Sequence, residues 1–349
     1  VVLVQVPECA KPMLVALRNS VLRAGAHPVA QYLPDKISRE FYELANEEQI
    51  NFFPEKFMRG KAEQIDHTIS FIAEVNKKEL QGIDPKKIMD RSKSMKPYRE
   101  WLDDKENEGR YSWVIAMYGT EEMAKEVNMS IEEYWDQIIK ACYLDENDPI
   151  KKWKEIQVEN NYFVEKLNSM RIEKVHVEAE NTDLWVRIGE KRRWQGCSGR
   201  NIPSFEIFTS PDWREVNGHI KFTEPLYRYG NLIKDIFLRF EKGIVVEFSA
   251  SEGEDILREM IKAENANKIG EFSMTDGRMS RITKYMGETL YDENVGGKEG
   301  NMHLALGNAY QDCYEGDPAK VSKEEWKAFV KSVYGICLIQ FPTLVVRLV

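Results

Sequence analysis

The sequence predicts an α/β N-terminal domain with a parallel sheet, followed by an α+β C-terminal domain with antiparallel strands. At the start, a β-branched run over Val1–Val6, a helical period over Lys11–Ala26 and an extended pattern over His27–Tyr32 form a strand–helix–strand unit, which requires parallel strands. In the second half the pattern changes to period-2 alternation with hairpin signals, which is typical of antiparallel strands. A division of the 349 residues into 1–172 and 173–349 therefore predicts two domains of ordinary size.

The remaining elements of the first half repeat the same pattern. Thr68–Val75 and Trp113–Tyr118 are extended segments separated by helical stretches, so the strand–helix–strand unit recurs. Ser130–Glu133 has the spacing of a capping box and opens a helix through Ala141. Pro149 begins another long helix, because proline is well tolerated in the first turn.

The second half is predicted to consist of strands followed by helices. Its strands are Val175–Ala179, Leu184–Ile188, Ile233–Glu241 and Ile244–Ala250. The last two flank Lys242-Gly243, which indicates a tight hairpin turn. Ser251–Glu254 is predicted to cap a helix that runs to about Asn267.

Composition and missing motifs exclude several classes of protein. The net charge of −9 argues against a nucleic-acid partner, because phosphate binding needs clustered basic residues. No apolar run reaches the roughly 18 residues of a membrane span. The five cysteines include no C-x-x-C pair, as expected of reduced thiols in a cytoplasmic protein. The sequence also lacks the glycine-rich motifs that bind nucleotides. It contains neither the G-x-S-x-G motif of α/β-hydrolases nor the H-E-x-x-H motif of zinc proteases.

Four residues in the second half stand in unusual contexts: Glu206, Glu271, Glu293 and His303. A carboxylate in an apolar segment costs free energy unless a positive charge pairs with it, and a divalent cation supplies that charge. Three glutamates and a histidine form a mixed oxygen and nitrogen set that suits zinc, cobalt or manganese. The residues alone leave other interpretations open: each glutamate fits a salt bridge or a surface position, and His303 fits a packed core.

Four segments together resemble the M29 family of metalloaminopeptidases, the aminopeptidase T and PepS type. They occur in the family's order and at nearly its spacing: Gly199–Pro211, Ile269–Phe272, Thr289–Asn294 and His303–Tyr310. The resemblance implies a cytoplasmic homodimer that removes N-terminal residues from peptides with a free N-terminus, using two divalent metal ions. The pattern of the first half is that of an α/β scaffold over 1–172, and the resemblance implies that 173–349 is the catalytic, metal-binding domain.

Carried over residue by residue, the resemblance assigns Glu206, Glu271, Glu293 and His303 as metal ligands, with Glu271 bridging, and Tyr310 as an active-site tyrosine. In two-metal hydrolysis an activated water attacks the scissile carbonyl, Glu206 or Glu271 takes its proton, and Tyr310 donates to the oxyanion. If His303 opens a short helix, Tyr310 lies on the same face about two turns later. The alternative is a catalytically silent member that binds peptide or metal as a dimer.

The resemblance fades after Trp326. Family members carry a His-x-Asp pair beyond the position of His303, whereas here no histidine follows it and the only later aspartates are Asp312 and Asp317. Three glutamates and one histidine are few for two ions that each take about four ligands. We therefore expect this sequence to bind the two metals poorly, or to bind only one. The start at Val1 and the apolar end predict that the natural termini are incomplete or altered.

Overall fold

The computed structural model describes the chain except residues 298–299, 323–325, 327–330 and 341–344, so the predicted departure after Trp326 lies partly outside the described residues. The chain folds into two compact units, which are described separately. The first is Val1–Ile138 with Gly199–Ile202, and the second is Ile139–Ser198 with Pro203–Val349.

The division between these units precedes the domain boundary predicted at 172–173. Helix α9 (Pro149–Ser169) accounts for the difference, because its apolar residues pack against the core of the second unit. The two predicted domains, as parts that fold independently, stay a prediction.

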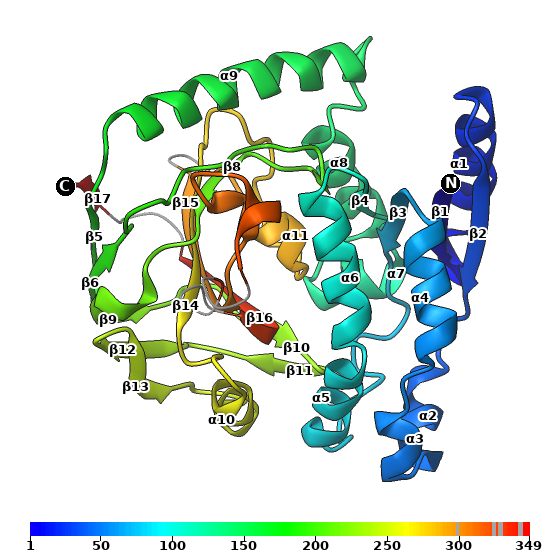
Figure 1. Ribbon diagram of the computed structural model, residues 1–349, viewed down its shortest axis with the longest axis horizontal. Helices are drawn as coiled ribbons and strands as arrows, with labels where there is room; N and C mark the ends of the chain where they lie inside the picture. The colour runs from blue at the N-terminus through cyan, green and yellow to red at the C-terminus, as the bar shows by residue number, and fades with distance from the viewer. Residues whose placement is uncertain (298–299, 323–325, 327–330, 341–344) are drawn as a thin grey trace. The chain divides into compact units, whose positions relative to one another are not determined.

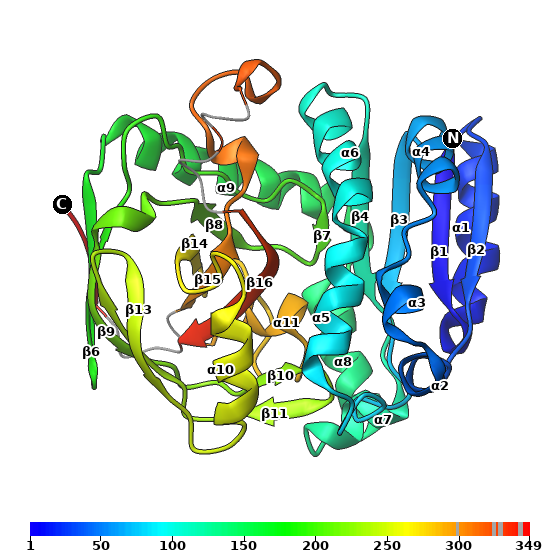
Figure 2. The same cartoon turned by 60° about the horizontal axis from the view of Figure 1, so that its bottom comes forward.

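The first unit is built on a parallel sheet with strand order β2-β1-β3-β4-β7. The strands are β1 (Val2–Pro7), β2 (Pro28–Leu33), β3 (His67–Ile72), β4 (Ser112–Met117) and β7 (Asn201–Ile202). The helices that follow them are α1 (Lys11–Arg23), α2 (Ser38–Leu44), α3 (Glu47–Asn51), α4 (Glu55–Gln64), α5 (Pro85–Ser94), α6 (Lys96–Asn107), α7 (Glu121–Glu126) and α8 (Ile131–Ala141), of which α8 continues into the second unit from Ile139. Helix α1 lies on one face of the sheet, and α4 and α6 lie on the other (Figures 1 and 2).

The predicted parallel sheet and its local signals are confirmed. Ser130 and Glu133 form the predicted capping box: the Glu133 amide donates to Ser130 Oγ (3.1 Å), and the Ser130 amide donates to the Glu133 carboxylate (3.0 Å). Pro149 is the first residue of α9. The alternating valines of β1 are buried against α1, which explains why a short β-branched run becomes a central strand.

The second unit contains two antiparallel sheets and a short ribbon. The larger sheet has the order β13-β12-β9-β6-β5-β17, the smaller has the order β16-β15-β14-β8, and β10 pairs with β11. The larger sheet is formed by β5 (Lys174–Ala179), β6 (Thr182–Arg187), β9 (Val216–Lys221), β12 (Phe237–Glu241), β13 (Ile244–Ser249) and β17 (Val345–Leu348). The smaller is formed by β8 (Glu206–Thr209), β14 (Ile269–Thr275), β15 (Asn301–Asn308) and β16 (Lys331–Gln340). The others are β10 (Leu226–Arg228), β11 (Asn231–Ile233), α10 (Glu254–Lys262) and α11 (Thr289–Asp292).

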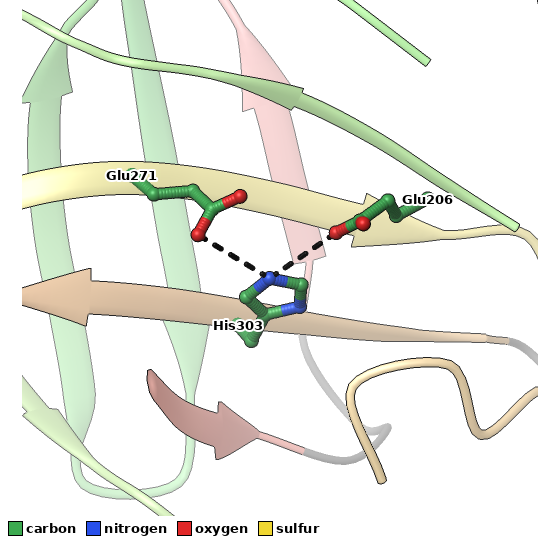
Figure 3. A group of neighbouring side chains, drawn as sticks. All are labelled: Glu206, Glu271 and His303. Atoms are coloured by element: carbon green, nitrogen blue, oxygen red, sulfur yellow. Dashed lines mark ion pairs between the residues drawn. The ribbon is translucent and has the colours of Figure 1, made fainter. Parts of the chain in front are cut away.

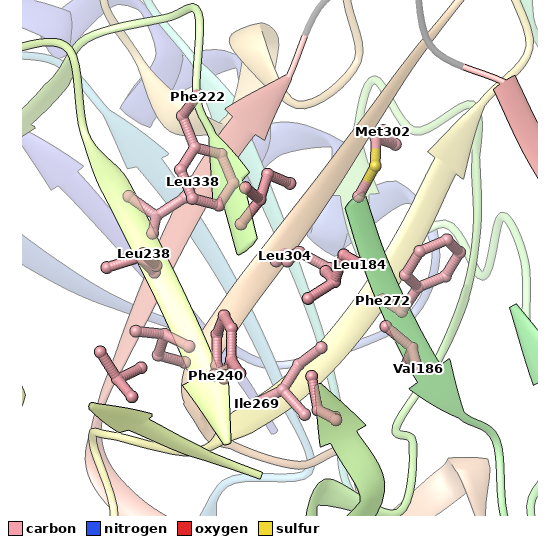
Figure 4. Close-up of a cluster of buried hydrophobic side chains, with 14 of the residues drawn as sticks. Leu184, Val186, Phe222, Leu238, Phe240, Ile269, Phe272, Met302, Leu304 and Leu338 are labelled. Carbon is pink, nitrogen blue, oxygen red and sulfur yellow. The ribbon is translucent and has the colours of Figure 1, made fainter. Parts of the chain in front are cut away.

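The two larger sheets share one apolar core. Figure 4 shows Leu184 and Phe240 from the six-stranded sheet among Phe272 and Leu304 from the four-stranded sheet, and all four side chains are buried. Burying a side chain of this size contributes about 1.5–3 kcal/mol each. This packing fixes which face of the four-stranded sheet points into the core and which face is left for polar residues.

Two local predictions in this unit have different outcomes. The hairpin at Lys242-Gly243 is confirmed, because both residues have positive φ between β12 and β13. The predicted cap by Ser251 is wrong: Gly253, in a left-handed conformation, precedes α10, and no side chain caps the helix. Among the described residues, no helix has the length and apolar character needed to cross a membrane.

Candidate metal centre

The four-stranded sheet has one apolar face and one polar face. Its apolar face carries Ile207, Phe272, Met274, Met302 and Leu304, which belong to the core or pack against it. The register pairs Glu206 with Thr275, and pairs Ser273 with both Phe208 and His303. Because directly paired residues of antiparallel strands lie on the same face, β8, β14 and β15 bring their polar residues to one surface.

A β-bulge at Gly270 places Glu271 on that surface. Strand β14 shifts register so that Ile269 pairs with Leu306 and Glu271 pairs with Ala305. Without the extra residue, Ile269 and Glu271 would lie on the same face, whereas Ile269 is fully buried in the core. Gly270 is needed here, because an added Cβ would overlap the backbone of Asn308.

Three of the four predicted ligands come together on this face (Figure 3). His303 Nε2 lies 3.4 Å from Glu206 Oε2 and 3.9 Å from Glu271 Oε2. One ligand atom from each residue lies within 4.8 Å of the others, and all three side chains are buried. These separations exceed the usual 2.7–3.2 Å of a direct hydrogen bond.

The spacing and the chemistry of the cluster both fit a divalent cation. Two ligands bound at about 2.0–2.2 Å around a tetrahedral ion lie about 3.4 Å apart, close to the His303–Glu206 separation. Carboxylate oxygen and imidazole nitrogen are the donors that zinc and similar ions accept. Glu206, Glu271 and His303 would therefore hold such an ion.

The pKa values of the cluster reflect buried charge. Burial, reinforced by the neighbouring Glu271, raises the pKa of Glu206 to about 7, although His303 acts in the opposite direction. Burial alone would lower the pKa of His303, but the attraction of Glu271, Glu206 and Glu293 outweighs it and raises the pKa to about 9. Without a metal ion, both Glu206 and His303 thus hold a proton more tightly than they would in water.

Glu293 lies near the cluster but is not one of its three members. It is the C-cap of α11 and is buried, and Thr275 Oγ1 donates to its backbone carbonyl at 2.8 Å. Its charge contributes to the raised pKa of His303, so it lies within electrostatic reach of the imidazole. The structure therefore places the fourth predicted ligand beside the centre, outside the group of three.

Tyr310 is reached by a different route from the one predicted. The helix expected from His303 is wrong: His303 belongs to strand β15, and Tyr310 follows the end of that strand. The Tyr310 amide donates to Ser210 Oγ at 2.7 Å, and its ring packs edge-on against Phe208 at 5.3 Å between centroids. Since Phe208 shares a face with His303, the half-exposed Tyr310 lies against the polar face of the sheet.

Three residues around Glu206 escaped the sequence prediction. Ser273 Oγ donates to Glu206 Oε2 at 3.1 Å, Ser204 Oγ donates to Glu206 Oε1 at 3.4 Å, and Asn160 Nδ2 donates to the Glu206 carbonyl at 3.2 Å. A serine in a strand and an asparagine in a helix are common, so the sequence contains no signal that would single them out.

The buried carboxylate–imidazole cluster on one face of the antiparallel sheet is a candidate metal centre. The sequence profile of the family described as thermophilic metalloprotease (M29) matches residues 1–331. Since this is most of the chain, the protein belongs to the M29 family.

Relatives and a solved structure agree with this assignment. Aminopeptidase AmpS of Bacillus subtilis is 30% identical over 333 residues, which is 88% of this chain and 79% of the relative. Aminopeptidase T of Thermus thermophilus is 29% identical over 312 residues, which is 82% of this chain and 74% of the relative. The structure of wild-type AmpT from Thermus thermophilus has a TM-score of 0.80 at 25% identity, covering 99% of this chain and 89% of that one. The predicted fold class is confirmed.

Proposed function

We propose that this protein is a metal-dependent aminopeptidase that hydrolyses the N-terminal residue from peptides with a free N-terminus. One observation carries the proposal: the buried cluster of Glu206, Glu271 and His303, in a chain whose relatives are named aminopeptidases. A divalent ion held by this cluster would acidify a water molecule and polarise the scissile carbonyl. We further propose that the enzyme is a cytoplasmic homodimer, as the family resemblance implies.

The chain's own residues then have distinct roles. Glu206, Glu271 and His303 would hold the cation, and Glu206 or Glu271 accepts the proton that the attacking water loses. Glu293 adds negative charge beside them. The Tyr310 phenol, half-exposed against the same face of the sheet, donates to the oxyanion that develops on the scissile carbonyl.

The number of ions depends on how many ligands the centre offers. Among the described residues, Glu206, Glu271 and His303 cluster, and three ligands serve one ion better than two, since each ion takes about four. We propose that a complete family site holds two zinc, cobalt or manganese ions, and that this chain binds one ion firmly and a second poorly.

Hydrolysis of an aminoacyl-p-nitroanilide, after cobalt or zinc is added to the metal-free protein, tests the function. We expect release of p-nitroaniline that a chelator abolishes, and no release from the N-acetylated substrate. Metal content after dialysis gives the number of firmly bound ions. Absence of turnover with every metal, despite bound metal, would favour the silent binding protein instead.

A further inference from the structure

Glu206 begins β8, the edge strand of the four-stranded sheet. An edge strand presents unpaired backbone groups on its outer side. Here Gln195 pairs with Phe208 through two backbone hydrogen bonds of 2.8 and 2.9 Å, which covers the middle of that edge. The Glu206 carbonyl lies at the start of β8, outside this pair. Its hydrogen bond comes instead from helix α9.

Asn160 supplies that bond from inside α9. Its side chain is fully buried, Nδ2 donates to the Glu206 carbonyl at 3.2 Å, and Oδ1 accepts from the Cys197 amide at 2.9 Å. The backbone at Gly196 lies so close to the Asn160 side chain that an added Cβ on Gly196 would overlap Asn160 Oδ1. One amide thus fixes both the start of β8 and the segment beside it.

Two buried serines fix the other end of Glu206, its carboxylate. Ser273, in β14, donates to Oε2 at 3.1 Å, and Ser204, two residues before β8 begins, donates to Oε1 at 3.4 Å. Oε2 is the oxygen 3.4 Å from His303 Nε2. Ser273 therefore contacts the same oxygen that faces the imidazole, and it leaves the second lone pair of that oxygen for a cation.

We propose that Ser273 and Asn160 are positioning residues for Glu206. Ser273 orients the carboxylate oxygen toward the other ligands, and Asn160 holds the backbone from which that carboxylate extends. The inference rests on the proposed function only in taking the Glu206–Glu271–His303 cluster as the metal centre. Partners that orient metal ligands cost about 10–100-fold in affinity when they are removed.

Cobalt binding to the full-length, metal-free protein tests the proposal directly. The affinity for Co²⁺ is measured by competition with a chelator, and the visible spectrum of bound Co²⁺ reports the geometry. We expect Ser273→Ala and Asn160→Leu each to weaken binding by about 10–100-fold and to change the spectrum. Thermal unfolding of each metal-free variant records the accompanying loss of stability.

Two matched controls separate positioning from general stability. Thr209→Val removes a buried hydroxyl from β8 that donates to the Arg193 carbonyl at 3.0 Å. Asn168→Leu removes another asparagine of α9, whose amide pairs with the Trp194 backbone at 3.1 and 2.8 Å. Neither contact involves a residue of the cluster. Both controls should keep Co²⁺ affinity within about twofold of the unmodified chain, because nothing that orients a ligand is lost.

The outcomes distinguish the two levels of argument. If the unmodified chain binds no Co²⁺, the metal centre itself is refuted. If it binds Co²⁺ and Ser273→Ala binds equally tightly, the role of Ser273 is overturned, and an unchanged Asn160→Leu overturns that of Asn160. If the Asn168→Leu control weakens binding as much as Asn160→Leu, the effect of Asn160 is general stability. Should Asn160→Leu fail to fold, Ser273→Ala against Thr209→Val decides the proposal.

Discussion

Glu271 is buried, with its Oε2 3.9 Å from His303 Nε2, and we propose it as the bridging carboxylate. Glu271→Gln keeps the size of the side chain and removes its charge, so a cation held by the cluster would lose one of the negative charges that balance it. We expect Co²⁺ affinity and hydrolysis to fall together, each by more than the roughly 10–100-fold loss that supporting residues cause. Full metal content with normal turnover in this variant would exclude Glu271 as a ligand.

Tyr310 is proposed to contact the substrate through its hydroxyl group. Removing its hydroxyl in Tyr310→Phe keeps the ring contact with Phe208, 5.3 Å between centroids, so the fold should be undisturbed. Loss of an oxyanion donor should lower kcat by about 10²–10³-fold, with metal content unchanged. If the variant loses its metal instead, Tyr310 supports the centre and does not act on the substrate. Unchanged kcat would remove it from the mechanism.

Glu224 provides a pH-dependent prediction away from the proposed centre. Burial raises the pKa of its carboxyl from 4.5 to about 7. The folded state holds this proton more tightly than the unfolded state. The protonated Glu224 carboxyl therefore stabilises the fold at low pH, and this contribution is lost as the pH rises from 4.5 to about 7. The free energy of unfolding of Glu224→Gln minus that of the unmodified chain should therefore be larger above pH 7 than below pH 4.5. Urea unfolding at both pH values measures this, and an unchanged difference would contradict it.

At the scale of elements, the bulge of β14 decides whether Glu271 faces the cluster. Gly270→Ala forces a Cβ against the Asn308 backbone, so β14 must move away from β15. Such overpacking costs about 1–3 kcal/mol. We expect lower stability to urea and weaker Co²⁺ binding together, since Glu271 adjoins the displaced residue.

Gly60→Ala is the control for this substitution. Gly60 lies within helix α4, where an added Cβ has no atom within 4 Å. It should leave Co²⁺ binding unchanged and stabilise the chain by about 0.5–1 kcal/mol, because alanine favours a helix interior. A Gly270→Ala protein with normal stability and affinity would show that the bulge is not required.

The same elements show what the sequence could and could not predict. The capping box of α8 and the Lys242-Gly243 hairpin are encoded within a few residues, so they could be predicted locally. The apolar run after His303 fits a helix or a strand equally well, and only its pairing with β14 decides between them. The cluster joins three strands distant in sequence, so no local spacing connects its residues. The apolar contexts of Glu206 and Glu271 make them candidates, and only the family resemblance assigns them as ligands.

At the scale of the whole molecule, the residues of the centre belong to one of the two compact units. Glu206, Glu271, His303 and the supporting Asn160 all lie in the second unit, whereas the parallel sheet belongs to the first. Metal binding should therefore suppress local unfolding in the second unit more than in the first. A ligand present at 100 times its Kd stabilises the state that binds it by about 2.7 kcal/mol.

Hydrogen exchange measured with and without Co²⁺ resolves this difference. We expect chelation to lower the midpoint of thermal unfolding and to speed amide exchange in β8, β14 and β15, because opening these strands breaks up the cluster. Exchange in β1 and β3, which belong to the first unit, is the internal reference and should change little. Restoring Co²⁺ should restore protection, and zinc should act in the same way. If the protein takes up metal while the exchange of β8, β14 and β15 stays unchanged, the ion binds elsewhere and the assignment of Glu206, Glu271 and His303 is wrong.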